Sequence, residues 1–202
     1  GIASRGLGDV YKRQGVEFLA NVAFEHMKKI GKRVIVLGGG NTAMDCCRTS
    51  RRIGGEDVKI VVRSPFEDMK ASPWEIEDAK NEDVPFYNNM SPKEYVVEDG
   101  KLKGMLFEKV EAKYDEDGKR KLIPTGESDV FIEADEVIVA IGQDVAFPWI
   151  EKDLGIKFNE WGLPIVNKET FQSSLPSVFF AGDAAFGPEN IITSVAHGHQ
   201  VA

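Results

Sequence analysis

Hydrophobic and polar positions follow two different patterns along the chain, and the first pattern is that of a buried strand followed by an amphipathic helix. Arg33–Leu37 is a strongly apolar run of the kind buried in a parallel sheet, and Thr42–Ile53 has the spacing of a helix. Gly54 and Gly55 end this helix, and Val58–Val62 supplies a second strand. The order strand, helix, strand predicts a βαβ unit with a parallel sheet.

The segments around this unit extend the prediction. Val16–Ile30 carries apolar residues at helical spacing and predicts a helix that packs beside the first strand. Pro73–Lys80 predicts another helix, with proline at its start, and Val84–Tyr87 predicts a third parallel strand. Residues 1–14 have no apolar periodicity, so we interpret them as a leader outside the domain.

The second pattern is strict alternation of polar and apolar residues. It occupies the segments Glu94–Val97, Lys101–Lys109 and Val110–Tyr114. Asp99-Gly100 and Asp117-Gly118 punctuate these segments as hairpin turns, which predicts a small antiparallel meander. Asp135–Gly142 returns to the buried-strand pattern and closes the unit.

The remaining residues, 146–202, predict a separate structural unit. Leu154–Phe158 and Leu163–Val166 have the pattern of a short hairpin. A strand, a Gly182-Asp183 turn and a helix from near Pro188 follow. Because the helical pattern still runs at Ala202, we expect the chain to be a fragment of a longer protein.

Composition narrows the class of protein. The chain has 202 residues and a net charge of −8, with no basic stripe, which argues against a nucleic-acid partner. No apolar run has membrane-spanning length and no secretory signal is recognisable, so we expect a soluble, cytoplasmic protein without a membrane partner. Cys46 and Cys47 are adjacent and have neither redox nor zinc-ligand spacing, which favours a packing role.

The turn after the first strand carries the candidate chemistry. Gly38, Gly40 and Ala43 fill the G-x-G-x-x-G/A pattern of a dinucleotide-binding turn. Gly38 permits the tight turn, Gly40 allows the backbone to approach a pyrophosphate, and Ala43 keeps the helix close to the sheet. The helix N-terminus then favours the phosphate charge. A glycine-rich loop of an unrelated α/β protein is the alternative.

Three separated stretches together resemble a known family. GGGNTAMD from Gly38, DEVIVAIGQ from Asp135 and VFFAGDAAFGP from Val178 resemble flavin-dependent pyridine nucleotide oxidoreductases, most of all the small (beta) subunit of glutamate synthase and its relatives. The resemblance implies an α/β fold in which residues 15–145 form a Rossmann-like NAD(P)-binding domain, with a parallel sheet and an antiparallel meander. Residues 146–202 would then be the C-terminal part of an FAD-binding domain into which the first is inserted.

The resemblance also implies cofactor contacts. On the nicotinamide-nucleotide side they are Gly38, Gly39, Gly40, Asn41, Thr42 and Ala43, and on the flavin side they are Gly182, Asp183, Asn190 and Ile191. Gly142, in the stretch DEVIVAIGQ, is a further predicted cofactor contact. The Asp183 carboxylate would accept hydroxyl hydrogen bonds from the flavin ribityl or pyrophosphate region. The helix that begins near Asn190 would face the flavin ring with its N-terminus. Read alone, Gly182-Asp183 could equally be an ordinary strand-to-helix turn.

The residues that end the second strand bear on the choice of nicotinamide cofactor. An NAD site usually has Asp or Glu there, whereas this chain has Arg63 and Ser64 and no carboxylate. An arginine suits a 2′-phosphate, and Lys70 could assist it. The family often has two adjacent arginines here, so Ser64 is a departure. We favour NADP and leave NAD open, together with the alternative that Arg63 is a solvated surface charge.

The resemblance implies a module that transfers hydride from NADPH to FAD, with the cofactors carrying the chemistry. FAD would belong to the full-length protein, and a large subunit or an iron–sulfur domain would accept the electrons. We name no catalytic residue and no metal ligand, since His197 and His199 lie on different faces of the last helix. We expect this fragment to be inactive alone. The alternative function is a non-catalytic nucleotide-binding or scaffold module that lacks a functional FAD site.

Overall fold

The protein is described by a computed structural model that covers residues 12–114, 120–142, 146–151 and 153–202. The chain divides into two compact units, Gly1–Gly142 and Gln143–Ala202. This division lies close to the boundary that we expected between residues 145 and 146. Each unit is described below by itself.

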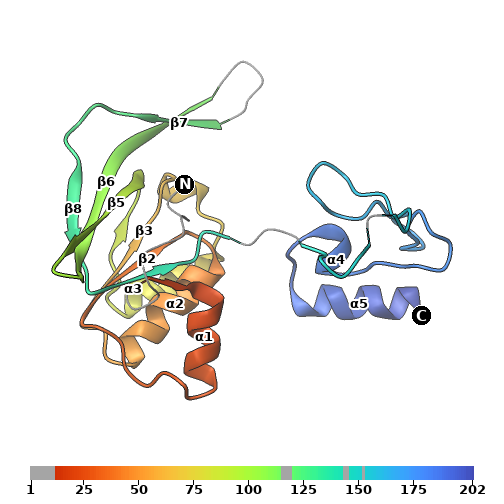
Figure 1. Cartoon of the computed structure of the whole chain (residues 1–202), viewed down its shortest axis with the longest axis horizontal. Helices are drawn as coiled ribbons and strands as arrows, with labels where there is room; N and C mark the ends of the chain where they lie inside the picture. The colour runs from red at the N-terminus through yellow and green to blue at the C-terminus, as the bar shows by residue number, and fades with distance from the viewer. Residues whose placement is uncertain (1–11, 115–119, 143–145, 152) are drawn as a thin grey trace. The chain divides into compact units, whose positions relative to one another are not determined.

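The first unit is an alternation of strands and helices followed by a run of strands (Figure 1). Its elements are β1 (Lys12–Gln14), α1 (Gly15–Ala23), β2 (Arg33–Leu37), α2 (Asn41–Arg52), β3 (Asp57–Val61), a 3-10 turn (Phe66–Asp68), α3 (Pro73–Asn81), β4 (Phe86–Tyr87), β5 (Met90–Glu98), β6 (Lys101–Tyr114), β7 (Arg120–Pro124), β8 (Val130–Glu133) and β9 (Glu136–Val139).

The strands of this unit form two sheets. The first has the order β1-β9-β2-β3-β4, and each of its pairings is parallel. The second is antiparallel, with β6 paired to β5, β7 and β8. Helices α1, α2 and α3 cover one face of the parallel sheet and the antiparallel sheet covers the other (Figure 1). The predicted α/β class, with a parallel sheet and an antiparallel meander, is confirmed.

The position of β2 between two layers explains why its sequence is apolar at successive positions. Val34 and Val36 point to the helices and pack in one buried cluster, while Ile35 and Leu37 point to the antiparallel sheet and pack in a second cluster. Each of the four side chains is at most 2% exposed. Because successive strand residues face opposite sides, a strand between two layers must be apolar on both faces.

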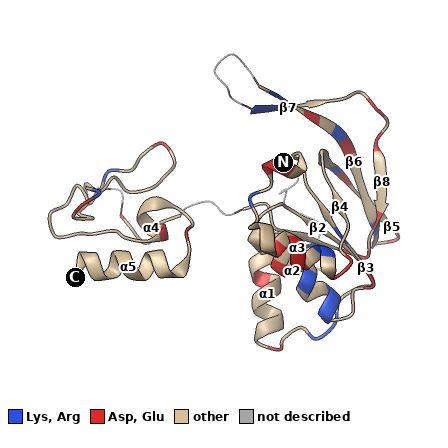
Figure 2. Ribbon diagram, turned by 180° about the vertical axis from the view of Figure 1, so that it is seen from behind, with Lys and Arg blue, Asp and Glu red and all other residues tan. Residues whose placement is uncertain are grey.

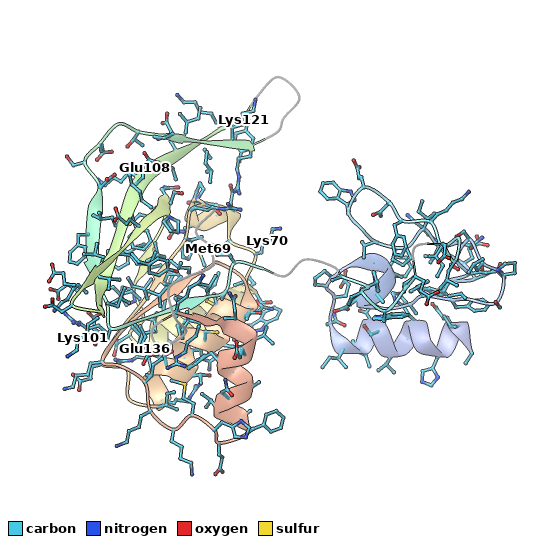
Figure 3. All side chains as sticks on the ribbon, viewed as in Figure 1. Met69, Lys70, Lys101, Glu108, Lys121 and Glu136 are labelled. Carbon is cyan, nitrogen blue, oxygen red and sulfur yellow. The ribbon has the colours of Figure 1, made fainter. Side chains whose placement is uncertain are left out.

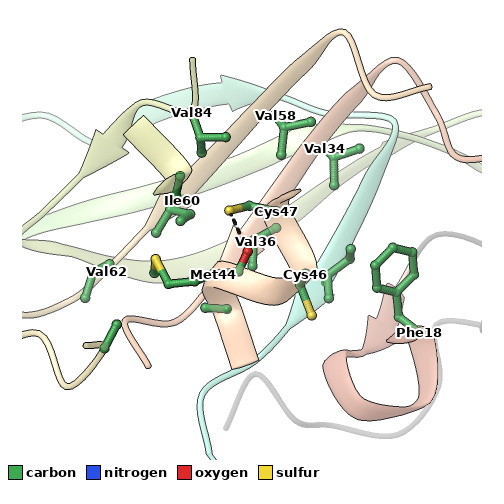
Figure 4. Close-up of a cluster of buried hydrophobic side chains, with 14 residues drawn as sticks. Phe18, Val34, Val36, Met44, Cys46, Cys47, Val58, Ile60, Val62 and Val84 are labelled. Carbon is green, nitrogen blue, oxygen red and sulfur yellow. Dashed lines mark hydrogen bonds between the residues drawn. The ribbon is translucent and has the colours of Figure 1, made fainter. Parts of the chain in front are cut away.

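Helix α2 presents its two cysteines to the helix-side cluster (Figure 4). Cys46 and Cys47 are free thiols with 0% exposure, and the Cys47 thiol donates to the carbonyl oxygen of Met44 at 3.1 Å. The packing role predicted for both residues is confirmed. Burial raises the pKa of each thiol from 9.0 to about 12.

The raised thiol pKa values predict a loss of stability in alkaline solution. Above about pH 9 the unfolded chain ionises its cysteines while the folded chain keeps them protonated up to about pH 12, so the free energy of unfolding falls as the pH rises through this window. We expect a loss of about 2 kcal/mol for each cysteine between about pH 8 and about pH 10.5, measured by urea unfolding. The variant in which both cysteines are alanine is the control. An equally steep pH dependence in that variant would contradict the prediction.

The two hairpin signals of the meander have different outcomes. Asp99 and Gly100 have φ values of +51° and +72° and connect β5 to β6, so the predicted Asp-Gly turn is confirmed. Lys101–Lys109 and Val110–Tyr114, predicted as separate segments, are one strand, β6. The Asp117-Gly118 turn lies outside the described residues.

The N-terminal predictions need correction. The helix predicted over Val16–Ile30 is α1, which ends at Ala23, because Glu25 has a φ of +59° and the chain turns there. Met27 and Ile30 continue the apolar spacing but reach the core from a loop. Residues 12–14, which we interpreted as part of a leader, form edge strand β1 and pair with β9.

The second unit consists mainly of turns before its helices. The hairpin predicted around residue 160 is present, since Phe158 and Pro164 form an antiparallel bridge and the Asn159 N–H donates to the Leu163 carbonyl oxygen at 2.8 Å. The helices are α4 (Asp183–Phe186) and α5 (Ile191–Val201). Within the described part of the chain, none of the helices is long and apolar enough to cross a bilayer.

Candidate functional site

The turn between β2 and α2 contains three glycines with different steric surroundings. Gly38 has a φ of +139°, and a Cβ there would lie 2.2 Å from the carbonyl oxygen of Ala140. A Cβ on Gly39 would lie 3.0 Å from Cγ1 of Val62. Gly40 has a φ of −104°, which any residue adopts, and a Cβ there would meet nothing within 4 Å. The fold therefore requires glycine at position 38, while Gly40 leaves open space beside the start of α2.

The start of α2 presents backbone donors to this space. Ala43 and Met44 donate their N–H groups to the Gly40 carbonyl oxygen at 3.0 and 3.3 Å, and Gly40 provides no side-chain cap. The amides of Asn41 and Thr42 precede these and have no partner within the helix. Ala43 is fully buried beneath the turn. Open space, helix amides and the positive end of the helix dipole together suit an anion.

The loop between β3 and α3 is fixed against the glycine turn. The Gly39 carbonyl oxygen accepts hydrogen bonds from the backbone N–H groups of Lys70 and Ala71, at 3.0 and 2.9 Å. Asn41 Oδ1 accepts the Ser72 N–H at 2.8 Å, and Asn41 Nδ2 donates to Ser72 Oγ at 3.4 Å. The side chain of Asn41, predicted only as a cofactor contact, therefore holds this loop. Met69 and Lys70 lie in the loop at this point (Figure 3).

Arg63 and Ser64 lie near the start of the same loop, with one residue between Arg63 and the end of β3. Gly38 donates its N–H to the Val61 carbonyl oxygen at 3.1 Å, so the ends of β2 and β3 lie side by side at one edge of the sheet. Arg63 is exposed, and within the described residues its side chain has no ion pair or hydrogen bond. The Ser64 carbonyl oxygen accepts from Asn88 Nδ2 at 3.0 Å. A fixed backbone thus carries an uncompensated guanidinium next to the glycine turn.

The end of β9 reaches the same edge of the sheet. The Ala140 N–H donates to the Leu37 carbonyl oxygen at 2.7 Å. Gly142, two residues further on, has a φ of +112°, and a Cβ there would meet nothing within 4 Å. The structure therefore brings together at one edge the predicted residues Gly38, Gly39, Gly40, Asn41, Thr42, Ala43, Arg63, Ser64 and Gly142.

Ion pairs join α2 and α3 behind this edge. Figure 2 marks the basic and acidic segments of the two helices. Arg48 of α2 is paired with Glu75 at 3.0 Å, Asp78 at 3.0 Å and Glu82 at 2.8 Å. The side-chain hydrogen bond to Glu82 raises the pKa of Arg48, so its charge is fixed. Because α3 continues the loop that begins with Arg63, this network also fixes the far end of that loop.

The second unit contains the remaining predicted residues. Gly182 has a φ of +58° and precedes α4, where Asp183 Oδ1 accepts the Glu189 N–H at 3.2 Å. Asn190 caps α5, since its Oδ1 accepts the Thr193 N–H at 3.0 Å. Ile191 follows and is 85% exposed. One continuous segment, which contains α4 and the start of α5, thus holds the four predicted residues Gly182, Asp183, Asn190 and Ile191.

His197 is a residue of this segment that sequence reasoning dismissed. Its Nδ1 accepts the Gly182 N–H at 3.2 Å. The spacing of His197 and His199 could not show that one of them reaches back fifteen residues to the turn. The sequence signal that could have found it is the position of a polar aromatic residue on the inner face of the helix.

Comparison with known proteins gives a family match. A model of the family described as Pyridine nucleotide-disulphide oxidoreductase matches residues 7–198. The match begins before residue 15, so residues 7–14 are not the leader outside the family that we expected.

Several characterised proteins are similar in sequence. The NADP(+)-dependent formate dehydrogenase subunit beta of Moorella thermoacetica is 33% identical over 190 residues, which are 93% of this chain and 27% of that protein. The glutamate synthase (NADPH) small chain of Escherichia coli is 35% identical over 178 residues, 85% of this chain and 38% of that protein. The chain thus spans 27% and 38% of the lengths of these two relatives.

Solved structures share the fold. Thioredoxin reductase of T. acidophilum has a TM-score of 0.69 at 22% identity, covering 94% of this chain and 54% of that chain. FprA of Mycobacterium tuberculosis in complex with NADPH has a TM-score of 0.63 at 17% identity, covering 85% of this chain and 51% of that chain. At this level of identity the likeness concerns the fold alone.

Proposed function

Because the chain belongs to the pyridine nucleotide-disulphide oxidoreductase family, we propose that it is the NADPH-binding part, with a portion of the FAD-binding part, of a flavin-dependent oxidoreductase. The observation that carries the proposal is the open space over Gly40 at the N-terminus of α2, flanked by the exposed Arg63. The proposed reaction is hydride transfer from NADPH to FAD.

The residues at this edge of the sheet fit a dinucleotide phosphate. The pyrophosphate would lie over Gly40 and accept hydrogen bonds from the first amides of α2, where no Cβ stands in the way. Arg63 would bind the 2′-phosphate, since its guanidinium can form two parallel hydrogen bonds to a phosphate. Ser64 and Lys70 would add further donors, and no carboxylate stands at residues 61–64 to bind a ribose 2′-hydroxyl. These features favour NADPH over NADH.

The residues of the second unit would serve the flavin. FAD, when bound, supplies the redox chemistry by accepting a hydride. Asp183 would accept hydroxyl hydrogen bonds from it, and the N-terminus of α5, capped by Asn190, would place its positive end near the ring. Gly182 would allow the backbone to approach closely.

The relatives guide the proposal about partners. They include a formate dehydrogenase beta subunit, an NADPH-Fe(3+) oxidoreductase beta subunit and glutamate synthase small chains, all longer than this chain. We therefore propose that a large subunit or an iron–sulfur domain accepts the electrons, with a glutamate synthase small-subunit-like protein as the parent. A cytoplasmic location, where thiols such as Cys46 and Cys47 stay reduced, fits this role.

Substitution of Arg63 tests the cofactor assignment. We expect Arg63→Ala to weaken NADPH binding by about 1–3 kcal/mol, or about 5- to 150-fold in Kd, because one charge-assisted contact to phosphate is lost. The Kd for NADH should change little. Isothermal titration calorimetry of the 202-residue chain with each nucleotide measures both values.

Arg52→Ala is the matched control, because Arg52 is also an exposed arginine but lies at the opposite end of α2, paired with Glu82. An equal loss of NADPH and NADH affinity in the Arg63 variant would show that Arg63 does not bind the 2′-phosphate. Failure of the wild-type chain to bind either nucleotide would overturn the proposed function itself.

A further inference from the structure

His197 packs against two phenylalanine rings within the second unit. Its ring centroid lies 5.1 Å from that of Phe171 and 5.0 Å from that of Phe186, and the two phenylalanine rings are themselves 5.7 Å apart. Phe171 is 3% exposed and holds a φ of +58°, which a bulky residue adopts only where its surroundings demand it. The imidazole is therefore fixed by packing from two sides.

The imidazole meets the Gly182 backbone through a single hydrogen bond. The Gly182 N–H donates to His197 Nδ1 at 3.2 Å, so this nitrogen carries no proton and the neutral ring is protonated on Nε2. Gly182 is buried, and a buried backbone N–H is costly to leave without an acceptor. His197 thus satisfies a donor at the start of the turn.

Gly182 needs this support because of its backbone conformation. Its φ of +58° and ψ of −147° lie in a region that is essentially confined to glycine. A Cβ there would lie 2.8 Å from Ser194 Oγ of α5, so the turn lies directly on that helix. The same Ser194 hydroxyl donates to Asp183 Oδ1 at 3.4 Å. Helix α5 therefore contacts both residues of the turn.

We propose that His197 is a positioning residue that fixes the Gly182-Asp183 turn on α5 by accepting the Gly182 N–H. The catalytic importance of His197 rests on the proposed function. If α5 and Asp183 serve the flavin, His197 would keep Asp183 in a fixed position relative to α5. His197 acts through Gly182 and Asp183, and we assign it no contact with a cofactor.

The first test is the protonation pattern of His197 in the wild-type chain. Long-range ¹H–¹⁵N NMR of the labelled chain at about pH 8, where an ordinary imidazole is neutral, distinguishes the two ring nitrogens. We expect His197 to be protonated on Nε2 with Nδ1 as an acceptor. A ring protonated on Nδ1 would overturn the proposal without any variant being made.

The second test separates the hydrogen bond from the packing. His197→Phe keeps an aromatic ring between Phe171 and Phe186 but removes the acceptor, and we expect hydrogen exchange of the Gly182 amide to become roughly tenfold faster. His197→Asn loses the ring but places an acceptor near the position of Nδ1, and it should bring Gly182 exchange back to within roughly threefold of wild type. His199→Phe, an exposed position on the same helix, is the control and should leave Gly182 exchange unchanged.

The outcomes distinguish this inference from the proposed function. Unchanged Gly182 exchange in His197→Phe would overturn the positioning role, and so would failure of His197→Asn to slow the exchange relative to His197→Phe. If the Phe variant does not fold, the ring protonation in the wild-type chain decides. Neither measurement uses a nucleotide or flavin, whereas NADPH binding by the Arg63 variant tests the proposed function alone.

Discussion

Gly38→Ala is expected to lower the free energy of unfolding of the first unit by about 3–5 kcal/mol, the largest effect of any single methyl group that we predict. The added Cβ would lie 2.2 Å from the Ala140 carbonyl oxygen and 2.7 Å from its carbon, and the φ of +139° is itself unfavourable for alanine. Retreat of Ala140 is opposed, because its N–H donates to the Leu37 carbonyl oxygen at 2.7 Å. Urea unfolding followed by circular dichroism measures the loss.

Gly54→Ala is the matched control for this variant. Gly54 has a comparable φ of +112°, but a Cβ there would meet nothing within 4 Å, so its cost is the backbone strain alone, about 1–2 kcal/mol. The difference between the two variants therefore isolates the clash at Ala140. Equal losses of stability in both would contradict the steric argument for Gly38.

The parts of the fold that sequence predicts well are those decided by local burial. The strand predicted at Arg33–Leu37 is β2 with the same bounds, since a run that is apolar on both faces fits only a strand covered by two layers. The Asp99-Gly100 turn was equally predictable, because both residues adopt positive φ readily. In these places local preference and tertiary environment agree.

The parts that sequence misses depend on partners distant in the chain. β1 has no apolar pattern, and it is recognisable only through its pairing with β9 and the ion pair between Arg13 and Glu136 at 2.6 Å. The helix predicted to Ile30 is too long because Met27 and Ile30 reach the same core from a loop. Periodicity reports which side chains are buried and does not report which element carries them.

The candidate site likewise has parts that the sequence predicts and parts that it misses. Its glycines are readable from a short pattern, whereas the hydrogen bonds that fix the loop from Arg63 to Ser72 join residues about thirty positions apart, as between Asn41 and Ser72. The loop has a further anchor in Arg120 of β7, which pairs with Asp68 at 2.8 Å. No spacing rule connects these residues. The antiparallel meander thus supports the loop that carries Arg63, the residue that we propose binds the 2′-phosphate.

Gly40→Ala is expected to weaken NADPH binding about 10- to 150-fold while leaving the fold intact. Gly40 has a φ of −104° and a ψ of 176°, which alanine adopts freely, and its added Cβ would meet nothing within 4 Å. The free energy of unfolding should therefore change by no more than about 1 kcal/mol. In the complex, however, the methyl group would occupy the space where the pyrophosphate approaches the first amides of α2. Calorimetric titration with NADPH and urea unfolding measure the two effects separately.

The contrast with Gly38→Ala makes this result diagnostic of a binding site. A methyl group at position 38 collides with the protein itself, whereas a methyl group at position 40 meets no protein atom within 4 Å and would collide only with the proposed nucleotide. Gly54→Ala is the control here too, because a Cβ at Gly54 also meets nothing within 4 Å but lies beyond the C-terminal end of α2, away from the turn, and its own cost is the strain of a φ of +112°. Loss of NADH affinity should parallel that of NADPH in Gly40→Ala, since both nucleotides share the pyrophosphate. Unchanged binding in a folded Gly40→Ala variant would refute the assignment of this turn to the nucleotide.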